Sequence, residues 1–225
     1  MFDTQGINLQ GLPQVVTAIG GLGTAAFGLV DATKVLLGGV NNIGFGAIKT
    51  QVKSLTPGNA ANSLSQSKIV ATLKANWFNG TDLASQKAIA KSLIKLNLNA
   101  ENAAELASVT GVDGATLKEI ATGIAAGTPL NAAQSDVYAR FDMILTALLD
   151  ETYQRSDNTY VNWTRALAAV IAIALAIVGG YAVKPHLEVW ESVLVGLLAT
   201  PLAPIAKDLS SALATAVNTM QLVKK

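Results

Sequence analysis

An uncharged run of 18 residues, Ala166 to Val183, most constrains how this chain can fold. As a helix rising about 1.5 Å per residue, the run would be about 27 Å long, close to the hydrocarbon thickness of a bilayer. A core helix of a soluble domain is seldom apolar on every face. Aromatic and basic residues lie at or near both ends of the run, as is typical at a membrane–water interface: Tyr160, Trp163, Arg165, Tyr181, Lys184 and Trp190. The sequence therefore predicts a membrane-spanning helix here.

A second predicted span lies near the N-terminus, over Gln14 to Val30, where no residue is charged. Small residues recur there every four positions, and this spacing lets two helix backbones approach closely in lipid. The alternative is a glycine-rich hydrophobic segment that lies on other helices. The predicted helix-packing residues are Gly20, Gly21, Thr24, Ala25 and Gly28.

A third apolar segment, Val189 to Ala206, is short for a full span, and Pro201 and Pro204 would kink it. It follows the strong span after a short loop, so the two segments should form an antiparallel hairpin. Beyond Lys207 and Asp208 the chain has an amphipathic pattern, typical of an interfacial helix.

Basic residues orient the predicted spans. They follow the first span, precede the second and follow the third, while one lysine lies on the other side. The positive-inside rule then places the N-terminus outside, and the middle domain and C-terminus inside, at a bacterial inner membrane. The residues concerned are Lys49, Lys53, Lys68, Lys74, Arg155, Arg165, Lys207, Lys224 and Lys225, with Lys184 opposite.

The predicted fold is all-α, with three transmembrane helices and a cytoplasmic helical bundle inserted between the first and second. Three parts follow: a membrane segment (1–54), a helical domain (55–158), and a transmembrane hairpin with its tail (159–225). Within the middle domain, Ser65 to Phe78 should bury Ile69, Leu73 and Trp77 on one face. Three further helices are predicted, from a Thr81 cap to Leu96, from an Asn99 cap to Val109, and from Asp113 to Ala126. A last helix should begin at about Pro129 and continue unbroken into the membrane. Its solvent-facing side should carry Asp142, Asp150, Glu151 and Asp157.

The composition offers little catalytic chemistry. The chain has no cysteine, one histidine and a formal net charge of +1, so thiolate sites and a general attraction to nucleic acid are not expected. We find no catalytic, metal-binding or cofactor-binding motif, and no small-molecule substrate is indicated. Asp31 and Lys34 form either a functional intramembrane charge pair or a neutralised interfacial one. His186, Glu188 and Glu191 form either a titratable cluster or an ordinary exposed loop.

Residues Ala104 to Ile120 resemble the helix-turn-helix of phage-repressor-type DNA-binding domains, whose first helix ends in Thr-Gly-Val as at Thr110 to Val112. A recognition helix needs cations for phosphates and polar side chains for base edges. Here the second helix offers Lys118 beside an acidic neighbour, Glu119. The pattern therefore favours a helical corner in a bundle over a nucleic-acid interface.

Roughly the last 90 residues resemble a family of uncharacterised bacterial integral membrane proteins with three spans. The resemblance is carried by Phe141-Asp142 followed by Tyr153-Gln154-Arg155 before a span, and by Ala203-Pro204, Asp208-Leu209 and Leu213 at the end. The family's basic cluster is reduced here to Arg155 and Arg165. The resemblance implies the three-span topology and no particular activity.

The leading hypothesis is a non-enzymatic structural or accessory subunit of a membrane assembly, associating through the small residues of the first span. A homo-oligomeric pore or channel is the alternative, and a membrane-tethered regulator is a third. The expected partners are the lipid bilayer and further copies of the chain or a larger membrane complex, without nucleic acid or cofactor.

Overall fold

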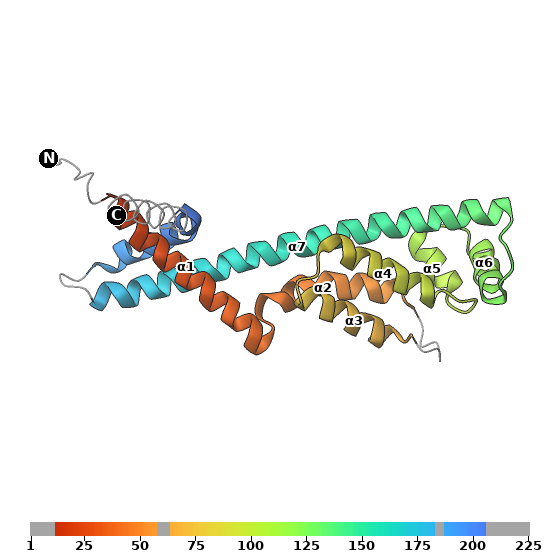
Figure 1. Cartoon of the computed structure of the whole chain (residues 1–225), viewed down its shortest axis with the longest axis horizontal. Helices are drawn as coiled ribbons and strands as arrows, with labels where there is room; N and C mark the ends of the chain where they lie inside the picture. Colours follow the sequence, from red (N-terminus) through yellow and green to blue (C-terminus); the bar gives the residue numbers. More distant parts are fainter. Residues whose placement is uncertain (1–11, 58–63, 183–186, 206–225) are drawn as a thin grey trace, which may run out of the picture. The chain divides into compact units, whose positions relative to one another are not determined.

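The computed structural model describes residues 12–57, 64–182 and 187–205, and every regular element in these ranges is an α-helix (Figure 1). The predicted all-α class is confirmed. The helices are α1 (Leu12–Leu37), α2 (Gly39–Ser54), α3 (Gln66–Phe78), α4 (Leu83–Asn97), α5 (Ala103–Thr110), α6 (Gly114–Ala126), α7 (Ala132–Ala182) and an unlabelled helix, Val189–Ile205.

The chain divides into two compact units. Unit 1 contains Met1–Val40 and Val161–Lys225, and unit 2 contains Asn41–Tyr160. The division differs from the expected first boundary, because most of α2 belongs to unit 2. Predictions for the N-terminal 11 residues, for Lys184 and His186, and for the tail from Ala206 lie outside the described residues.

A break at Gly38 separates the first two helices. Gly38 has a φ of 71°, a left-handed conformation that glycine adopts without a Cβ penalty. The apolar sequence from Val35 to Ile48 is therefore divided between the end of α1 and a new helix, α2.

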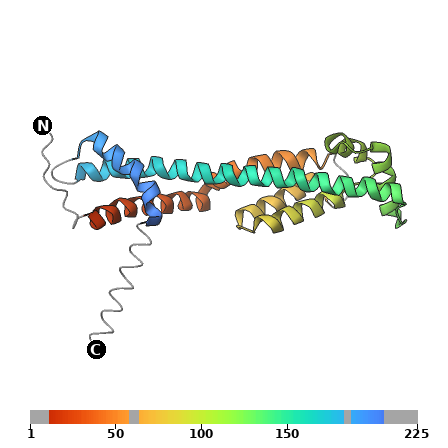
Figure 2. The same cartoon turned by 90° about the horizontal axis from the view of Figure 1, so that it is seen from above.

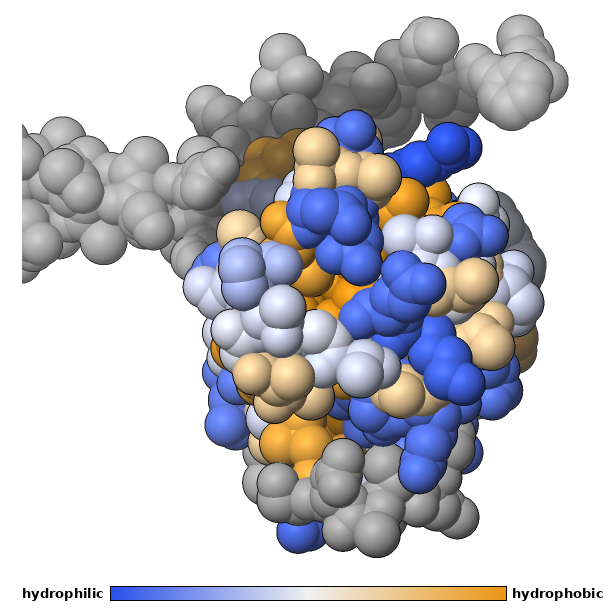
Figure 3. Space-filling model, turned by 90° about the vertical axis from the view of Figure 1, so that its right-hand side faces the viewer, coloured by the Kyte–Doolittle hydropathy of each residue, from blue (hydrophilic) through white to orange (hydrophobic). Residues whose placement is uncertain are grey.

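Unit 2 is built from α2 to α6 and the first part of α7. Ile69, Leu73 and Trp77 of α3 are buried on one face, as the periodicity predicted. In two perpendicular views α4 runs beside α7 (Figures 1 and 2), and ion pairs join these helices. The end of the unit that carries α5, α6 and the start of α7 presents mainly hydrophilic side chains (Figure 3).

Two predicted helix caps are wrong by one to three residues. Asp82, not Thr81, caps α4, and its carboxylate accepts a hydrogen bond from the Ser85 amide at 2.9 Å. Asn99 precedes α5 in a turn, where its side chain accepts from the Asn102 amide at 3.0 Å. The cap of α5 is then Asn102 itself. The first shift arises because the residue next to Thr81 takes the cap of α4, and the second because α5 begins one turn after Asn99.

The long helix predicted toward the membrane is confirmed. α7 has 51 residues without a break, and it contributes to both units. In unit 2 it buries Phe141, Leu145, Leu149 and Tyr153 at helical spacing. Its later part, in unit 1, is uncharged from Ala166 to Ala182.

Unit 1 contains the predicted antiparallel hairpin. Gly180 of α7 lies against Ser192, and Gly196 lies against the backbone of Ile173. These pairs run in opposite directions along the two helices, which establishes the hairpin. Ala26 of α1 completes a small apolar cluster with Ala172 and Ala199.

Two helices are long and apolar enough to cross a membrane, one over Val15–Lys34 and the other within α7. In each, 22% of the most apolar window is buried, whereas a core helix of a soluble protein would be mostly buried. The helix Val189–Ile205 is apolar but shorter. The third span and the cytoplasmic place of unit 2 remain predictions.

Candidate functional site

The small residues of α1 lie on two different faces of the helix. Gly20 is buried inside unit 1, whereas Gly21, Thr24, Ala25 and Gly28 are exposed. The Thr24 hydroxyl donates to the Gly20 carbonyl oxygen at 3.0 Å, so its polar hydrogen is satisfied within the helix. The four exposed residues, which we call the small face, therefore present a smooth surface without an unpaired hydroxyl donor.

Other small residues make the packing within unit 1. A methyl group added to Gly23 would collide with the Ala199 carbonyl and approach the Ala203 side chain to 3.0 Å. Ala26, one turn further along α1, is fully buried in the cluster with Ala172. Spacing alone predicted that α1 packs through small residues, but it did not identify Gly23. That assignment depends on where the hairpin touches α1.

Asp31 and Lys34 form an ion pair with 2.6 Å between the Lys34 nitrogen and an Asp31 carboxylate oxygen. The Asp31 side chain is 68% exposed and that of Lys34 is 21% exposed. Residues three apart on one helix turn meet readily in this way. The pair is local to α1, in agreement with a neutralised charge pair.

The predicted loop cluster after α7 is resolved only in part, since His186 lies outside the described residues. Glu191 accepts a hydrogen bond from the Glu188 amide at 2.9 Å, and Glu188 accepts one from the Trp190 indole at 2.6 Å. These carboxylates thus organise the start of the helix Val189–Ile205. In the described part of the chain, no three His, Asp or Glu side chains are grouped to hold a metal ion.

The helix-turn-helix segment corresponds to α5 and α6. Gly111 ends α5 in a left-handed conformation, and Asp113 caps α6 by accepting from the Thr116 amide at 2.7 Å. Hydrogen bonds from the Thr116 side chain and then from its amide hold the pKa of the Asp113 carboxyl below its ordinary range. The two helices pack into the core through Leu106 and Leu117, as a corner of a bundle does.

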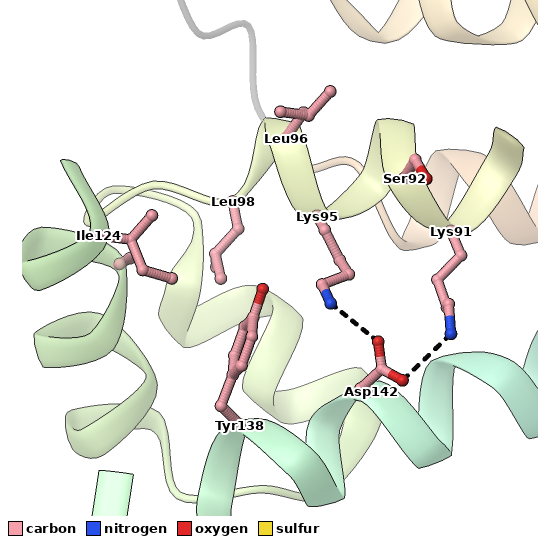
Figure 4. A pocket seen from close by; sticks show the side chains of 9 residues that line it. Lys91, Ser92, Lys95, Leu96, Leu98, Ile124, Tyr138 and Asp142 are labelled. Atoms are coloured by element: carbon pink, nitrogen blue, oxygen red, sulfur yellow. Dashed lines mark hydrogen bonds and ion pairs between the residues drawn. The ribbon is translucent and has the colours of Figure 1, made fainter. Parts of the chain in front are cut away.

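A polar cluster between α4 and α7 was not anticipated from the sequence. Asp142 receives hydrogen bonds from Lys95 at 2.9 Å and from Lys91 at 3.1 Å (Figure 4). About two turns further along α7, Asp150 pairs with Lys87 at 2.6 Å. Asp142 and Asp150, predicted on the solvent face of the helix, have side chains 31% and 50% exposed and are also paired with lysines of α4. The lysines recur every four residues along α4, which is the signal that could have suggested this ladder.

The charged groups of this cluster shift one another's pKa values. The hydrogen bond from Lys95 lowers the pKa of Asp142, burial partly opposes that effect, and the bond from Lys91 adds to it. Burial lowers the pKa of the Lys95 ammonium, but Asp142 and Tyr138 together raise it above its ordinary value. Both groups therefore stay charged at neutral pH.

No family model, no curated protein and no solved structure matches this chain. The molecule is thus defined by its own features, as a helical protein with two helices able to cross a membrane and a second, more polar helical unit. The family resemblance of its last 90 residues stays a prediction from short motifs.

Proposed function

We propose that this protein is a non-enzymatic structural subunit of a bacterial inner-membrane assembly, and that its copies associate through the small face of α1. In this proposal the N-terminus lies outside, and unit 2 and the C-terminus lie in the cytoplasm. The distribution of basic residues along the chain supports this orientation.

Exposed apolar side chains on unit 1 support its placement in lipid. Val170 and Val178 of α7 are 63% and 69% exposed. Leu194, Leu197 and Leu198 of the following helix are about half exposed. A water-facing surface with so many large apolar side chains would be costly, whereas in a bilayer these side chains contact hydrocarbon.

The observation that carries the association is the division of α1 into two faces. At 3.6 residues per turn, about 100° separates neighbouring residues, and Gly23, Ala26 and Val30 occupy one side of the helix. Gly21, Thr24, Ala25 and Gly28 occupy the opposite side and are exposed. Nothing in the described chain comes within 4 Å of a methyl group placed on Gly21 or Gly28. The small face is therefore free to pack against another helix, which small residues favour in lipid.

Replacing both exposed glycines by leucine tests the proposal. Gly21→Leu with Gly28→Leu should leave the chain folded and inserted, because both positions are open and leucine is favourable in lipid. The same change should separate the copies, because large side chains keep the helix backbones apart. Such contacts are worth about 1 kcal/mol each. Light scattering of the protein in mild detergent measures the assembly.

Gly179→Leu is the matched control, since Gly179 is an exposed glycine of α7 with equally open surroundings. It should leave the assembly at its original size. If the protein with Gly21→Leu and Gly28→Leu keeps its original assembly size, the proposal is wrong. Ion conductance in liposomes would then favour a pore.

A further inference from the structure

A hollow of about 470 Å³ opens between α4, α6 and α7 in unit 2. This volume lies within the range of about 300–1,000 Å³ that is usual for small-molecule sites. Leu98, Ile124 and the Tyr138 ring line one end, and the side chains of Lys91 and Lys95 line the other (Figure 4). The hollow is thus apolar at one end and cationic at the other.

The cationic end carries more positive than negative charge. Both lysine ammonium groups bond to the single carboxylate of Asp142, which is the one acid among the described residues that line the hollow. The three side chains are 29–32% exposed, so water screens their charges only in part. Lys95 also lies 4.7 Å above the centre of the Tyr138 ring. A second anion could therefore share the two ammonium groups.

We propose that this hollow binds a single-chain anionic amphiphile, with its carboxylate or phosphate head between Lys91 and Lys95 and its hydrocarbon chain against Leu98 and Ile124. A neutral amphiphile would leave the excess positive charge uncompensated. A free inorganic anion would leave the apolar end of the hollow without a partner. A molecule that combines both features satisfies both ends at once.

A fluorophore inside the hollow gives a direct test, because the chain has no cysteine of its own. Ser92→Cys places a polarity-sensitive dye on the lining, and the full chain is held in phosphatidylcholine nanodiscs. Octanoate and octyl phosphate should give saturable emission changes. Octanol and inorganic phosphate should each bind at least about tenfold more weakly than octanoate and octyl phosphate, since a charge-assisted hydrogen bond is worth at least that factor. The preferred head separates a fatty-acid carboxylate from a lipid phosphate.

A second labelled position controls for probes that merely enter the disc. Ser108→Cys lies on the exposed surface of α5, outside the hollow, and its dye should not respond. Equal responses at positions 92 and 108 would overturn the proposal. Inorganic phosphate that binds as tightly as octyl phosphate would also overturn it.

Substitutions that are expected to change binding in opposite directions distinguish a loss of the site from a loss of the fold. Lys95→Met and Lys91→Met should each weaken octanoate binding about tenfold. Asp142→Asn removes the competing carboxylate and should tighten it. Lys74→Met is the matched control, because Lys74 lies 4.9 Å above the Phe78 ring but outside the hollow. If Lys95→Met and Lys74→Met have the same effect, or Asp142→Asn weakens binding, the site is not as described.

Discussion

Trp77 donates a hydrogen bond from its indole nitrogen to the backbone carbonyl oxygen of Asn41, 3.1 Å away and 36 residues earlier in the chain. Its ring meets Tyr160 edge-on, with 6.0 Å between the ring centroids. Gly44 leaves the room for this arrangement. A methyl group there would lie 2.7 Å from the Trp77 ring and 2.9 Å from the Tyr160 Cβ. Three helices of unit 2 thus meet where one of them lacks a side chain.

Gly44→Ala should destabilise unit 2 by about 1–3 kcal/mol, because the added methyl group overpacks a closed contact. Gly46→Ala is the matched control in the same helix. A methyl group at Gly46 meets no atom of the described chain within 4 Å, and alanine favours a helix over glycine by about 1 kcal/mol. Urea unfolding followed by tryptophan fluorescence should give shifts of opposite sign. Equal shifts would contradict this packing.

Local sequence signals predicted most of the helices correctly. The helices predicted over Ser65 to Phe78 and Asp113 to Ala126 are α3 and α6, with Ser65 and Asp113 as their N-caps and Gly127 ending α6 in a left-handed conformation. The unbroken α7 followed from the absence of Gly and Pro between Pro129 and Gly179. The error at Thr81 is local, because two adjacent polar residues can each cap the same helix end. The error at Asn99 arises because α5 begins one turn later than predicted, with Asn102 at its N-cap position.

The candidate sites were less predictable because they depend on how distant segments meet. Small-residue spacing predicted packing along α1, but only the hairpin contact with Ala199 separates Gly23 from the exposed Gly21 and Gly28. Similarly, 47 positions separate Lys95 from Asp142 in the chain. In the sequence, each of these two residues looks like an ordinary surface charge. Only the register of α4 against α7 brings them together.

The acid stability of the protein should depend on Asp142. The ordinary pKa of an aspartate is 3.8, and the bonds from Lys95 and Lys91 lower that of Asp142 in the folded state. A depressed folded pKa adds stability above the unfolded pKa, and this stability is lost as the pH falls through the folded value. The urea concentration at the midpoint of unfolding should therefore decrease as the pH is lowered below about 4.

Asp142→Asn provides the comparison for this pH dependence. It should lower stability at pH 7 and flatten the decline at acid pH. Some decline should persist, since the capping hydrogen bonds to Ser85 and Thr116 also lower the pKa values of Asp82 and Asp113. Parallel curves for the two proteins between pH 3 and about pH 5 would show that Asp142 does not contribute in this way.

A charge in the apolar part of α7 should prevent stable insertion. Ala174 is exposed on that part of the helix, and an arginine at the middle of a span costs about 2.5–3.5 kcal/mol on insertion scales. Ala174→Arg should therefore reduce the protein in the membrane fraction. Ala147→Arg is the control, because Ala147 is exposed on the part of α7 that belongs to unit 2. Equal membrane levels of the two variants would count against a span in α7.

The proposed orientation predicts which surfaces a membrane-impermeant thiol reagent reaches in intact cells. Single cysteines are informative because the chain contains none. Ser85→Cys is exposed on α4 of unit 2, and Glu188→Cys is exposed just after α7. If unit 2 is cytoplasmic and α7 crosses the membrane, the reagent should label position 188 and spare position 85. Permeabilised cells should be labelled at both positions, which controls for reactivity. Labelling of position 85 alone in intact cells would reverse the orientation, and labelling of both would place the two positions on the same side.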